Sequence, residues 1–345
     1  MIKLKNKIAI GCLIQWYEID LIPQYLKSVK QALDNIENKK NVTIELYFNR
    51  SQTLEKIDES QTNLSEIHEK YDKLLLDIFN YDEEMSSYVG CEFNLVLKSN
   101  DYSNVTYTIA DYRRDFNDEY CEKVDVLMWG ETDSLIPRQT FEILDNLHSQ
   151  VKNDTPKYIS FFSTCKMWDE SWKELEHPDF TDKPFIDSDK EDKEHWWSLR
   201  YNMTIDEMNK INDKVEELDV RVANQYKFNG CGLVISSDVV KSGVNIPRSV
   251  FFVHEDTAFL NSMIKYFNGA IPQYIIKNVL LVHNRKHPLK RNYVLGEQNI
   301  DKANIGGKRL SHKWYEVANK MCEHNAYNLF NQSRVYTWKD VFNES

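Results

Sequence analysis

Two carboxylates one residue apart, Glu131 and Asp133, follow an apolar run over residues 124–129. The run predicts a buried strand, and ligands of open α/β sheets bind beyond the carboxyl ends of strands. Acids spaced i and i+2 can point to the same side of an extended segment. Carboxylate oxygens suit Mg²⁺ or Mn²⁺, and these ions commonly join a protein to substrate phosphates. The stretch therefore predicts a divalent-cation site, and the alternative is a solvated turn with two surface acids.

Two further chemically active positions stand at predicted element ends, the pair Glu255 and Asp256, and His283. A carboxylate within hydrogen-bond reach of a hydroxyl can serve as its general base. Asp256 is our candidate for that role, although an Asp at a helix start is also a favoured cap. Glu255 should point to a different side from its neighbour. His283 fits either a cation ligand or a strand-end histidine bonded to the backbone.

Alternating strand and helix patterns should bring these positions to one edge of a sheet. Strands over residues 7–13 and 41–48, with a helix over 19–35 between them, predict the β-α-β unit that opens a doubly wound sheet. Further strands are expected over residues 104–110, 124–129, 158–163, 228–236 and 275–283, with a strand-like run over 251–254. Further helices are expected over residues 65–85, 115–123, 137–151, 203–224, 257–267 and 311–328.

Composition bounds the class of protein. The chain has 345 residues, 41% hydrophobic and 12% aromatic, enough for one large α/β domain with additions or for two domains. A net charge of −11 gives no bulk attraction to nucleic acid or anionic membranes, although residues 286–291 could form a local basic groove. No apolar run has the length of a transmembrane helix, and the basic start precedes a strand rather than a signal-peptide cleavage site. Six cysteines without a CxxC motif are typical of buried thiols, so we expect a cytoplasmic protein.

Residues 166–200 differ from the rest in being acidic, rich in Trp and interrupted by Pro, which predicts an insertion. Trp168 could stack on a sugar ring or a base. The alternative is a satellite hydrophobic cluster under a long loop, which we favour for Trp196 and Trp197.

Several motifs, in this order, resemble the GT-A class of nucleotide-sugar glycosyltransferases and, within it, the family 2 type. The resemblance covers about residues 7–285. It rests on the opening strand and helix (residues 8–18 and 25–29), on Glu131-Thr132-Asp133 in the place of the DxD metal motif, on Asn229-Gly230-Cys231-Gly232, on His254-Glu255-Asp256 in the place of the acceptor-side "ED" motif, and on His283. Glu replaces the first Asp of DxD, which leaves contact with ribose or with a water-bridged metal open for Glu131.

The resemblance implies a GT-A (Rossmann-like) fold, a mixed, mainly parallel sheet flanked by helices. It divides the chain into a catalytic domain over residues 1–285 and a C-terminal helical extension over residues 286–345. Within the catalytic domain, residues 1–135 would form the nucleotide-sugar-binding half, and residues 136–285 the acceptor half with the insertion over 166–200.

The resemblance also implies metal-dependent, inverting transfer of a sugar from a nucleotide diphosphate sugar, which we expect to be a UDP-sugar, to a hydroxyl of a glycan or another acceptor. Asp133 would be the first ligand of Mn²⁺ or Mg²⁺, with His283 as the second and Glu131 as a further ligand. Asp256 would be the general base. The implied donor-binding residues are Gln15, Tyr17, Glu18, Asn49, Arg50, Arg113, Glu131 and Thr132. The implied acceptor-binding residues are Glu255, Trp168 and Gly230.

Two of the donor contacts have ordinary alternatives. Arg113 belongs to a basic stretch over residues 111–114, where the family places nucleotide or phosphate contacts and where Arg could bind phosphate bidentately. A solvated basic turn is the alternative. Asn49 and Arg50 end the second expected strand, where the alternative is an ordinary turn.

Three other functions remain open. A glycosyltransferase acting on hydroxymethylated DNA bases would turn residues 286–291 and the Trp-rich stretch toward DNA, against the acidic total charge. A sugar nucleotidyltransferase also pairs strand-end acids with Mg²⁺, but it usually has a Gly-rich loop after the first strand, where Gly11 stands alone. A carbohydrate-binding module would need no acidic metal pair, so a chelator would leave its binding intact.

Overall fold

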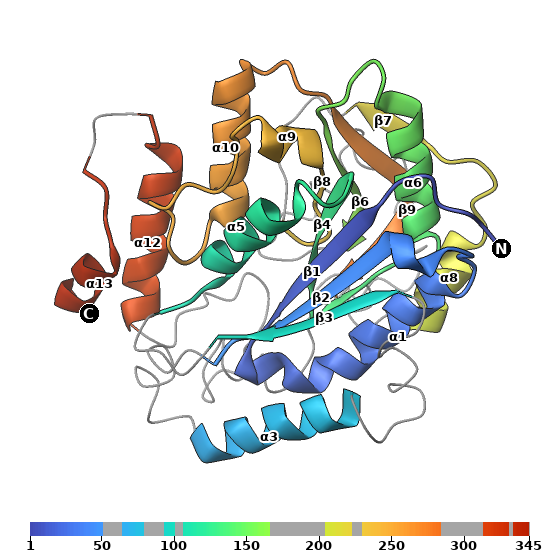
Figure 1. Cartoon of the computed structure of the whole chain (residues 1–345). Coiled ribbons are helices and arrows are strands. Elements are labelled where there is room, and N and C mark those ends of the chain that lie inside the picture. Colours follow the sequence, from blue (N-terminus) through green and yellow to red (C-terminus); the bar gives the residue numbers. More distant parts are fainter. Residues whose placement is uncertain are drawn as a thin grey trace, which may run out of the picture.

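The computed structural model describes residues 1–50, 64–78, 93–100, 106–165, 204–222, 230–283, 313–330 and 334–344. In these segments the strands form one nine-stranded sheet in the order β3-β2-β1-β4-β8-β6-β9-β5, with β7 beside β9 (Figure 1). They are β1 (Ile8–Ile14), β2 (Val42–Phe48), β3 (Asn94–Ser99), β4 (Val126–Glu131), β5 (Ser134–Leu135), β6 (Ile159–Cys165), β7 (Val220–Val222), β8 (Val234–Ser236) and β9 (Gln273–His283).

The directions of the strands bring most of their carboxyl ends to one edge. β1, β2, β3 and β4 are parallel to one another. β8 is antiparallel to both β4 and β6, so β6 runs in the direction of β4, and β9 is parallel to β6. The sheet is therefore mixed and mainly parallel, which confirms the expected fold class. The carboxyl ends of β1, β2, β4 and β9 share the edge where such sheets bind ligands.

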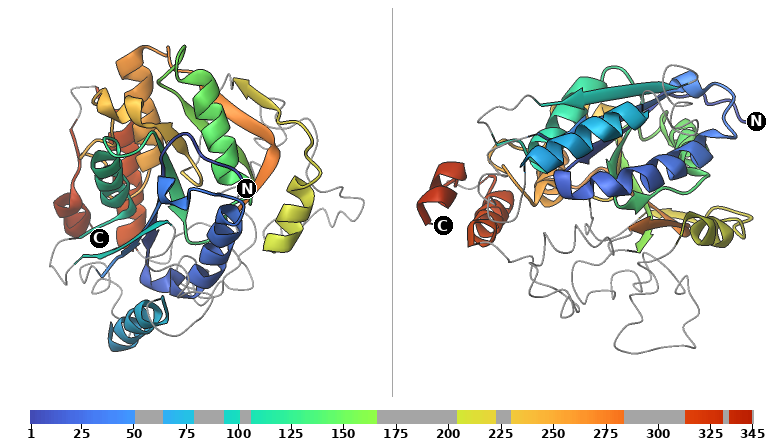
Figure 2. Two further views of the ribbon diagram at one scale, coloured as in Figure 1. Left: turned by 45° about the vertical axis from the view of Figure 1, so that its right-hand side comes forward. Right: turned by 90° about the horizontal axis from the view of Figure 1, so that it is seen from below.

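Helices cover both faces of the sheet, as two further views show (Figure 2). They are α1 (Ile22–Leu33), α3 (Leu64–Leu76), α5 (Ile109–Tyr120), α6 (Thr140–Val151), α8 (Ile205–Asn212), α9 (Ser237–Lys241), α10 (Glu255–Phe267), α12 (Lys313–Tyr327) and α13 (Trp338–Glu344), with 3-10 turns over Trp16–Leu21 and Lys39–Asn41.

β1 is the centre of the packing because its side chains alternate between two apolar cores. Its even-numbered residues pack with α1 and α6 on one face, and Ala9 and Leu13 pack with α5, α9 and α10 on the other. All seven residues of β1 are buried. Full burial of a large apolar side chain is worth roughly 1.5–3 kcal/mol, so this strand anchors both layers.

The strand expected over residues 104–110 is wrong. The third strand of the sheet is β3, which pairs with β2, and α5 begins at Ile109. Thr108 and Asp111 form a capping box, in which the Thr108 amide donates to the Asp111 carboxylate at 3.1 Å. This Thr-x-x-Asp pattern starts a helix and outweighs the short alternation of apolar residues before it. Tyr107 stacks on Tyr47 of β2 at 5.0 Å between ring centroids instead of joining the sheet.

Other expected elements are too long. The helix expected over residues 203–224 ends with α8, where the Asn212 side chain exchanges hydrogen bonds of 2.9 and 2.8 Å with the Leu280 backbone, and the edge strand β7 follows. The strand expected over 228–236 is confined, in its described part, to β8, because Gly232 turns the chain with φ of 72°. The run over 251–254 is not a strand, since His254 has φ of 64° and caps α10, and the short α9 is an unexpected helix.

The other expected elements lie near their predicted positions, whereas β3, β5 and α13 were not expected. Of the two C-terminal helices, α12 packs beside α10 and α13 packs on α12, around a small core that contains Trp314, Cys322 and Val341. Within the described segments, we find no helix with the length and apolar character needed to cross a membrane.

Candidate functional site

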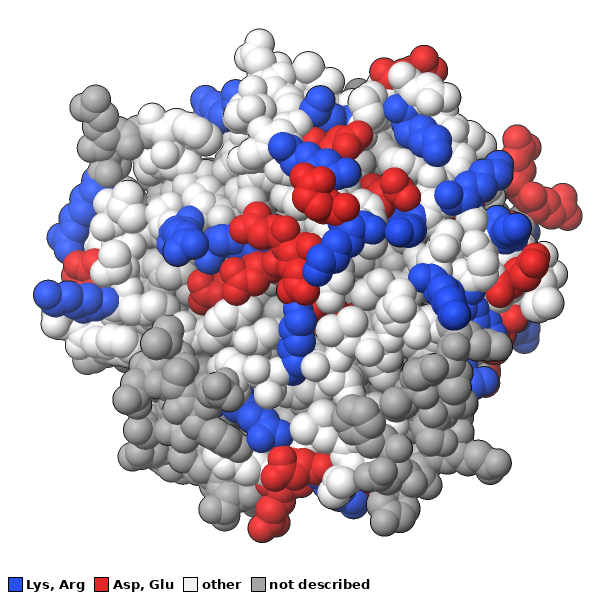
Figure 3. Space-filling model, in the orientation of Figure 1, with Lys and Arg blue, Asp and Glu red and all other residues white. Residues whose placement is uncertain are grey.

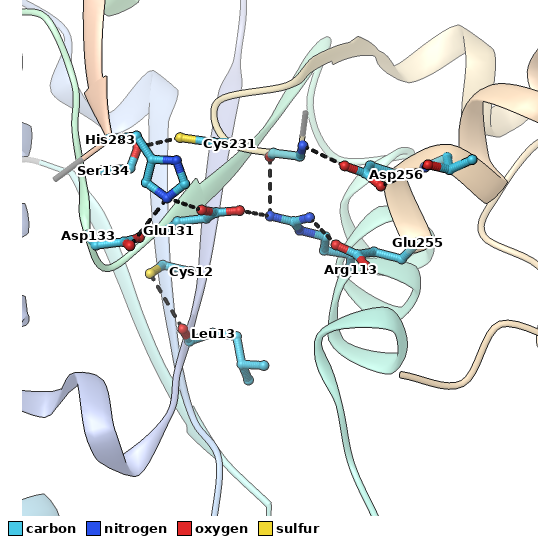
Figure 4. Close-up of polar contacts among 12 residues, drawn as sticks. Cys12, Leu13, Arg113, Glu131, Asp133, Ser134, Cys231, Glu255, Asp256 and His283 are labelled. Carbon is cyan, nitrogen blue, oxygen red and sulfur yellow. Dashed lines mark hydrogen bonds and ion pairs between the residues drawn. The ribbon is translucent and has the colours of Figure 1, made fainter. Parts of the chain in front are cut away.

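Two carboxylates and a histidine meet at the carboxyl edge of the sheet (Figure 4). Glu131 ends β4, and after a two-residue turn β5 runs back antiparallel to β9, with Ser134 opposite His283. The Nε2 atom of His283 lies 3.0 Å from Oε2 of Glu131 and 3.2 Å from Oδ2 of Asp133. Both acids therefore face one imidazole. The Asp133 and His283 side chains are fully buried, at 0% exposure, which excludes a solvated turn.

Arg113 joins this cluster to the start of α10 (Figure 4). Its Nη2 atom donates to Oε1 of Glu131 at 2.7 Å, and its Nη1 atom donates to Oε1 of Glu255. The guanidinium lies over the ring of Trp129, 4.7 Å from the centroid, and is 2% exposed. One buried guanidinium therefore forms ion pairs with both Glu131, at the end of β4, and Glu255, at the start of α10.

The basic stretch over residues 111–114 is not a solvated turn. Both arginines belong to α5 and are buried. The Arg114 guanidinium donates to the backbone carbonyls of Ile246, Pro247 and Val250. Arg114 thus holds the chain that leads into α10, and Arg113 binds protein carboxylates in the position where the sequence suggested a phosphate contact.

The charges of the cluster shift its acid–base equilibria. Burial alone would raise the pKa of Glu131, but His283 and Arg113 lower it by more, so the pKa of Glu131 lies well below its usual range. Burial alone would lower the pKa of Arg113, but Glu255 and Glu131 raise it above its usual value. Glu131 is therefore an ionised oxygen donor, and the guanidinium is a permanent cation.

Glu255 differs from Glu131 in its electrostatic environment. Burial is the largest influence and raises the pKa of Glu255 to about 7, Arg113 lowers it in part, and the neighbouring carboxylate of Asp256 raises it again. Glu255 therefore titrates near neutral pH, whereas the acid at the end of β4 does not.

The Gly230 peptide connects Arg113 to Asp256. Its carbonyl accepts from Nη2 of Arg113 at 3.2 Å, and its amide donates to Oδ2 of Asp256 at 3.0 Å. Oδ1 of Asp256 accepts from the Thr257 amide at 2.7 Å. A Cβ atom on Gly230 would lie 2.0 Å from Nη1 of Arg113, so only glycine permits this close approach. The carboxylate of Asp256 is thereby oriented by two backbone donors and lies to a different side from that of Glu255.

The expected donor-side residues divide into two groups. At the ends of β1 and β2, Nδ2 of Asn49 donates to the Gln15 side chain and to the Tyr107 carbonyl, both at 2.9 Å. Glu18 and Thr132 are buried, at 7% and 2% exposure. Arg50, in contrast, pairs with Asp72 of α3 at 2.8 Å and lies over the Tyr71 ring.

Other expected residues lie outside what the structure describes. They are the side chain of Tyr17, the insertion with Trp168, Trp196 and Trp197, Asn229, and the basic stretch over residues 286–291.

Cys231 belongs to the site although the sequence suggested only a buried thiol. Its Sγ atom donates to Oγ of Ser134 at 3.2 Å, and its Sγ lies with a carboxylate oxygen of Glu131 and a ring nitrogen of His283 in a group whose ligand atoms are all within 4.8 Å of one another. The residue follows Gly230 in a glycine-flanked turn. Its place in the motif Asn229-Gly230-Cys231-Gly232 was the available signal in the sequence.

The donor set fits a divalent cation. Asp133 and Glu131 offer carboxylate oxygens, His283 offers a ring nitrogen, and these atoms already converge. Such a set suits Mn²⁺ and Mg²⁺, which prefer oxygen ligands and tolerate imidazole.

Comparisons with known proteins give structural matches only. No protein-family model and no curated protein sequence matches the chain. A crystal structure of S. aureus TarS 1-349 matches with 11% identity and a TM-score of 0.42, over 81% of this chain and 60% of that chain. The mannosyltransferase PcManGT from Pyrobaculum calidifontis, in complex with GDP-Man and Mn²⁺, matches with 8% identity and a TM-score of 0.48, over 98% and 68%.

A mycobacterial protein also matches, with 11% identity and a TM-score of 0.39, over 86% of this chain and 73% of that chain. Identities of 8–11% with TM-scores below 0.5 assign no activity, so the geometry of the site carries the functional proposal.

Proposed function

We propose that the protein transfers a sugar from a nucleotide diphosphate sugar to an acceptor hydroxyl, with a divalent cation at Asp133, His283 and Glu131 and with inversion at the anomeric carbon. The observation that carries the proposal is the convergence of both carboxylates on Nε2 of His283 at 3.0 and 3.2 Å, at the carboxyl edge of the sheet. Buried acids that share one imidazole at a ligand-binding edge suit a cation that binds phosphate.

The donor would lie across the ends of β1, β2 and β4. Negative charge grows on the leaving diphosphate during transfer, and a bound Mn²⁺ or Mg²⁺ would neutralise it as a Lewis acid. Gln15 and Asn49, joined by their 2.9 Å hydrogen bond at the ends of β1 and β2, would contact the nucleotide, for which we propose uridine. Arg113 holds Glu131 in place for this role.

The acceptor would lie beside α10. The acceptor hydroxyl must lose a proton as it attacks, and the Asp256 carboxylate would take it. Two backbone amides at 3.0 and 2.7 Å orient that carboxylate, and its remaining lone pairs can accept from a hydroxyl. Attack opposite the leaving diphosphate, with one base and no covalent intermediate, would give inversion.

The test is a thermal-shift screen of UDP, GDP and other nucleoside diphosphates, with and without Mn²⁺, on the wild type, Asp133→Asn and the exposed-acid control Asp154→Asn. A ligand that binds only the native state raises stability by about 2.7 kcal/mol at a hundredfold excess over its Kd. We expect a Mn²⁺-dependent rise for the wild type and the control, and none for Asp133→Asn. Unchanged Mn²⁺-dependent affinity for UDP in Asp133→Asn would reject the cation site.

Transfer to modified DNA is less well supported. On the face drawn in Figure 3, the coloured Lys and Arg side chains are interspersed with Asp and Glu and form no continuous basic stripe. Duplex DNA binding across a salt series distinguishes this acceptor from a glycan, because phosphate contacts give steep salt dependence. A chelator that left sugar binding intact would indicate a carbohydrate-binding module.

A further inference from the structure

We propose that Cys231 is a ligand for a thiophilic divalent cation such as Zn²⁺, which it binds together with His283, Glu131 and Asp133. Zn²⁺ would then compete with Mn²⁺ or Mg²⁺ for the same position. The inference rests on the cation site of the proposed function, and it adds the thiol, which decides between hard and soft ions.

Three different kinds of donor atom are gathered at this point. Sγ of Cys231, a ring nitrogen of His283 and a carboxylate oxygen of Glu131 all lie within 4.8 Å of one another, and Oδ2 of Asp133 lies 3.2 Å from Nε2 of His283. Cys231 is 2% exposed and His283 is 0% exposed. A sulfur, a nitrogen and a carboxylate oxygen within this distance make a set of the kind that holds Zn²⁺, and Asp133 adds a second carboxylate beside the imidazole.

The backbone fixes the thiol in this position. Gly232, with φ of 72°, donates its amide to the Trp129 carbonyl at 2.9 Å, and the Trp129 amide donates to the Leu233 carbonyl at 2.9 Å. On the other side of the thiol, Gly230 is held by Arg113 and Asp256. Cys231 is therefore clamped between two anchored peptides, beside the point where β5 pairs with β9.

The thiol changes which ion is preferred. Thiolates select Zn²⁺ and related soft ions, whereas carboxylates alone suit Mg²⁺ and Mn²⁺, and Zn²⁺ also exceeds Mn²⁺ in general affinity for such sites. Binding of the cation would release the thiol proton to solvent. Because Asp133 and His283 would be engaged in both cases, Zn²⁺ would exclude the ion proposed for the donor diphosphate.

The experiment uses the full chain without nucleotide. Co²⁺ replaces Zn²⁺ as an optical probe, and a thiolate ligand gives an intense near-ultraviolet charge-transfer band. We expect this band in the wild type and its loss in Cys231→Ser. Calorimetric Zn²⁺ titration should show at least about a tenfold weaker Kd in Cys231→Ser, since even changes around a metal's ligands cost roughly 10–100-fold. Mn²⁺ binding should stay within about twofold, because carboxylates dominate it.

Two matched thiol variants complete the test. Cys121→Ser, at the C-terminal end of α5, should keep both the band and the Zn²⁺ affinity. Cys12→Ser removes another thiol near the carboxylates and should also keep them. A wild type without the band, a band that survives in Cys231→Ser or an unchanged Zn²⁺ affinity in that variant would overturn the inference. The wild-type band does not depend on how a variant folds, and its presence in a protein that binds no nucleotide would reject only the glycosyltransferase proposal.

Discussion

At the scale of single residues, Arg113 determines how the acids of the site are positioned. Its guanidinium forms ion pairs with both Glu131, at the proposed metal, and Glu255, at the start of α10. Its planar fork donates from two different nitrogens in fixed directions, a geometry that Lys cannot reproduce. The two acids are therefore held at a fixed separation, and the Gly230 carbonyl between them is held by the same guanidinium.

The role of Asp256 gives a prediction about the rate of transfer. Asp256→Asn keeps the side-chain size, but it cannot take a proton, and its single amide oxygen can accept from only one of the Gly230 and Thr257 amides. Donor and metal binding should be retained, and the transfer rate should fall by roughly two to four orders of magnitude, the usual worth of a general base. Single-turnover kinetics measures this fall.

The prediction has two ways to fail. Transfer by Asp256→Asn at close to the wild-type rate would remove the assignment of the base. A product that keeps the anomeric configuration of the donor, detected by NMR, would remove the inverting mechanism.

The raised pKa of Glu255 gives a prediction about stability. The carboxyl binds its proton more tightly when folded, with the pKa moved from 4.5 to about 7, so the folded state holds more protons than the unfolded state between these values. This contribution to stability is fully present below about pH 4.5 and is lost as the pH rises through about 7. Urea unfolding of the wild type should show it as a falling free energy across this window.

Glu255→Gln separates this effect from other titrations. The difference in unfolding free energy between the wild type and this variant should change across the window, while the exposed-acid control Glu122→Gln should differ from the wild type by a constant amount. A constant difference for Glu255→Gln as well would show that Arg113 keeps the acid ionised throughout.

At the scale of elements, the turn between Gly230 and Leu233 positions the Cys231 thiol and, through the Gly230 amide, the Asp256 carboxylate. Gly232 requires a positive φ, and an added Cβ atom would lie 2.7 Å from Cδ1 of Leu281. Gly243 also has a positive φ, of 93°, but no atom lies within 4 Å of its added Cβ among the described residues. Comparing Ala substitutions at these two glycines therefore separates the cost of backbone strain from the cost of steric collision.

We expect Gly243→Ala to lose about 1–2 kcal/mol, the usual cost of a left-handed backbone for a residue with a Cβ atom. Gly232→Ala should lose more, since the collision adds to the strain, and it should also weaken Zn²⁺ binding by displacing Cys231. Chemical unfolding and calorimetry measure the two effects. Equal stability losses, with Zn²⁺ affinity intact in both variants, would contradict the role of this turn.

The same scale shows what the sequence could predict. The apolar runs of β1, β4 and β9 were visible because buried parallel strands tend to be continuously apolar, and β2 was visible from its alternating apolar residues. α5 was misplaced because the alternation of Val105, Tyr107 and Ile109 around its start resembled a strand, whereas its true start signal was the Thr108–Asp111 pair. β8 and β7 were obscured because each lies inside a longer stretch that the sequence pattern assigned to one element, and the turns that divide these stretches depend on backbone angles that composition does not encode.

The site itself was only partly predictable. Glu131, Asp133 and His283 were identifiable because strand ends collect at one edge, and they do converge. The pairing of Arg113 with two carboxylates was not predictable. Its partners lie 18 and 142 positions away along the chain, and the contacts depend on the directions of the side chains. Cys231 was missed for the same reason, since its neighbours in space come from β4 and β9.

At the scale of the whole molecule, the order of the strands in the sheet differs from their order in the chain. β4 pairs on one side with β1 and on the other with β8, which is made about a hundred residues later, and His283 closes the cation cluster as the last residue of β9. A ribosome adds roughly 5–20 residues per second, so about 8–30 s separate the synthesis of Asp133 from that of His283. Until β8 has been made, β4 presents an unpaired edge, which is a template for aggregation. The nascent chain therefore has to protect this edge before any cation or donor can help to hold it.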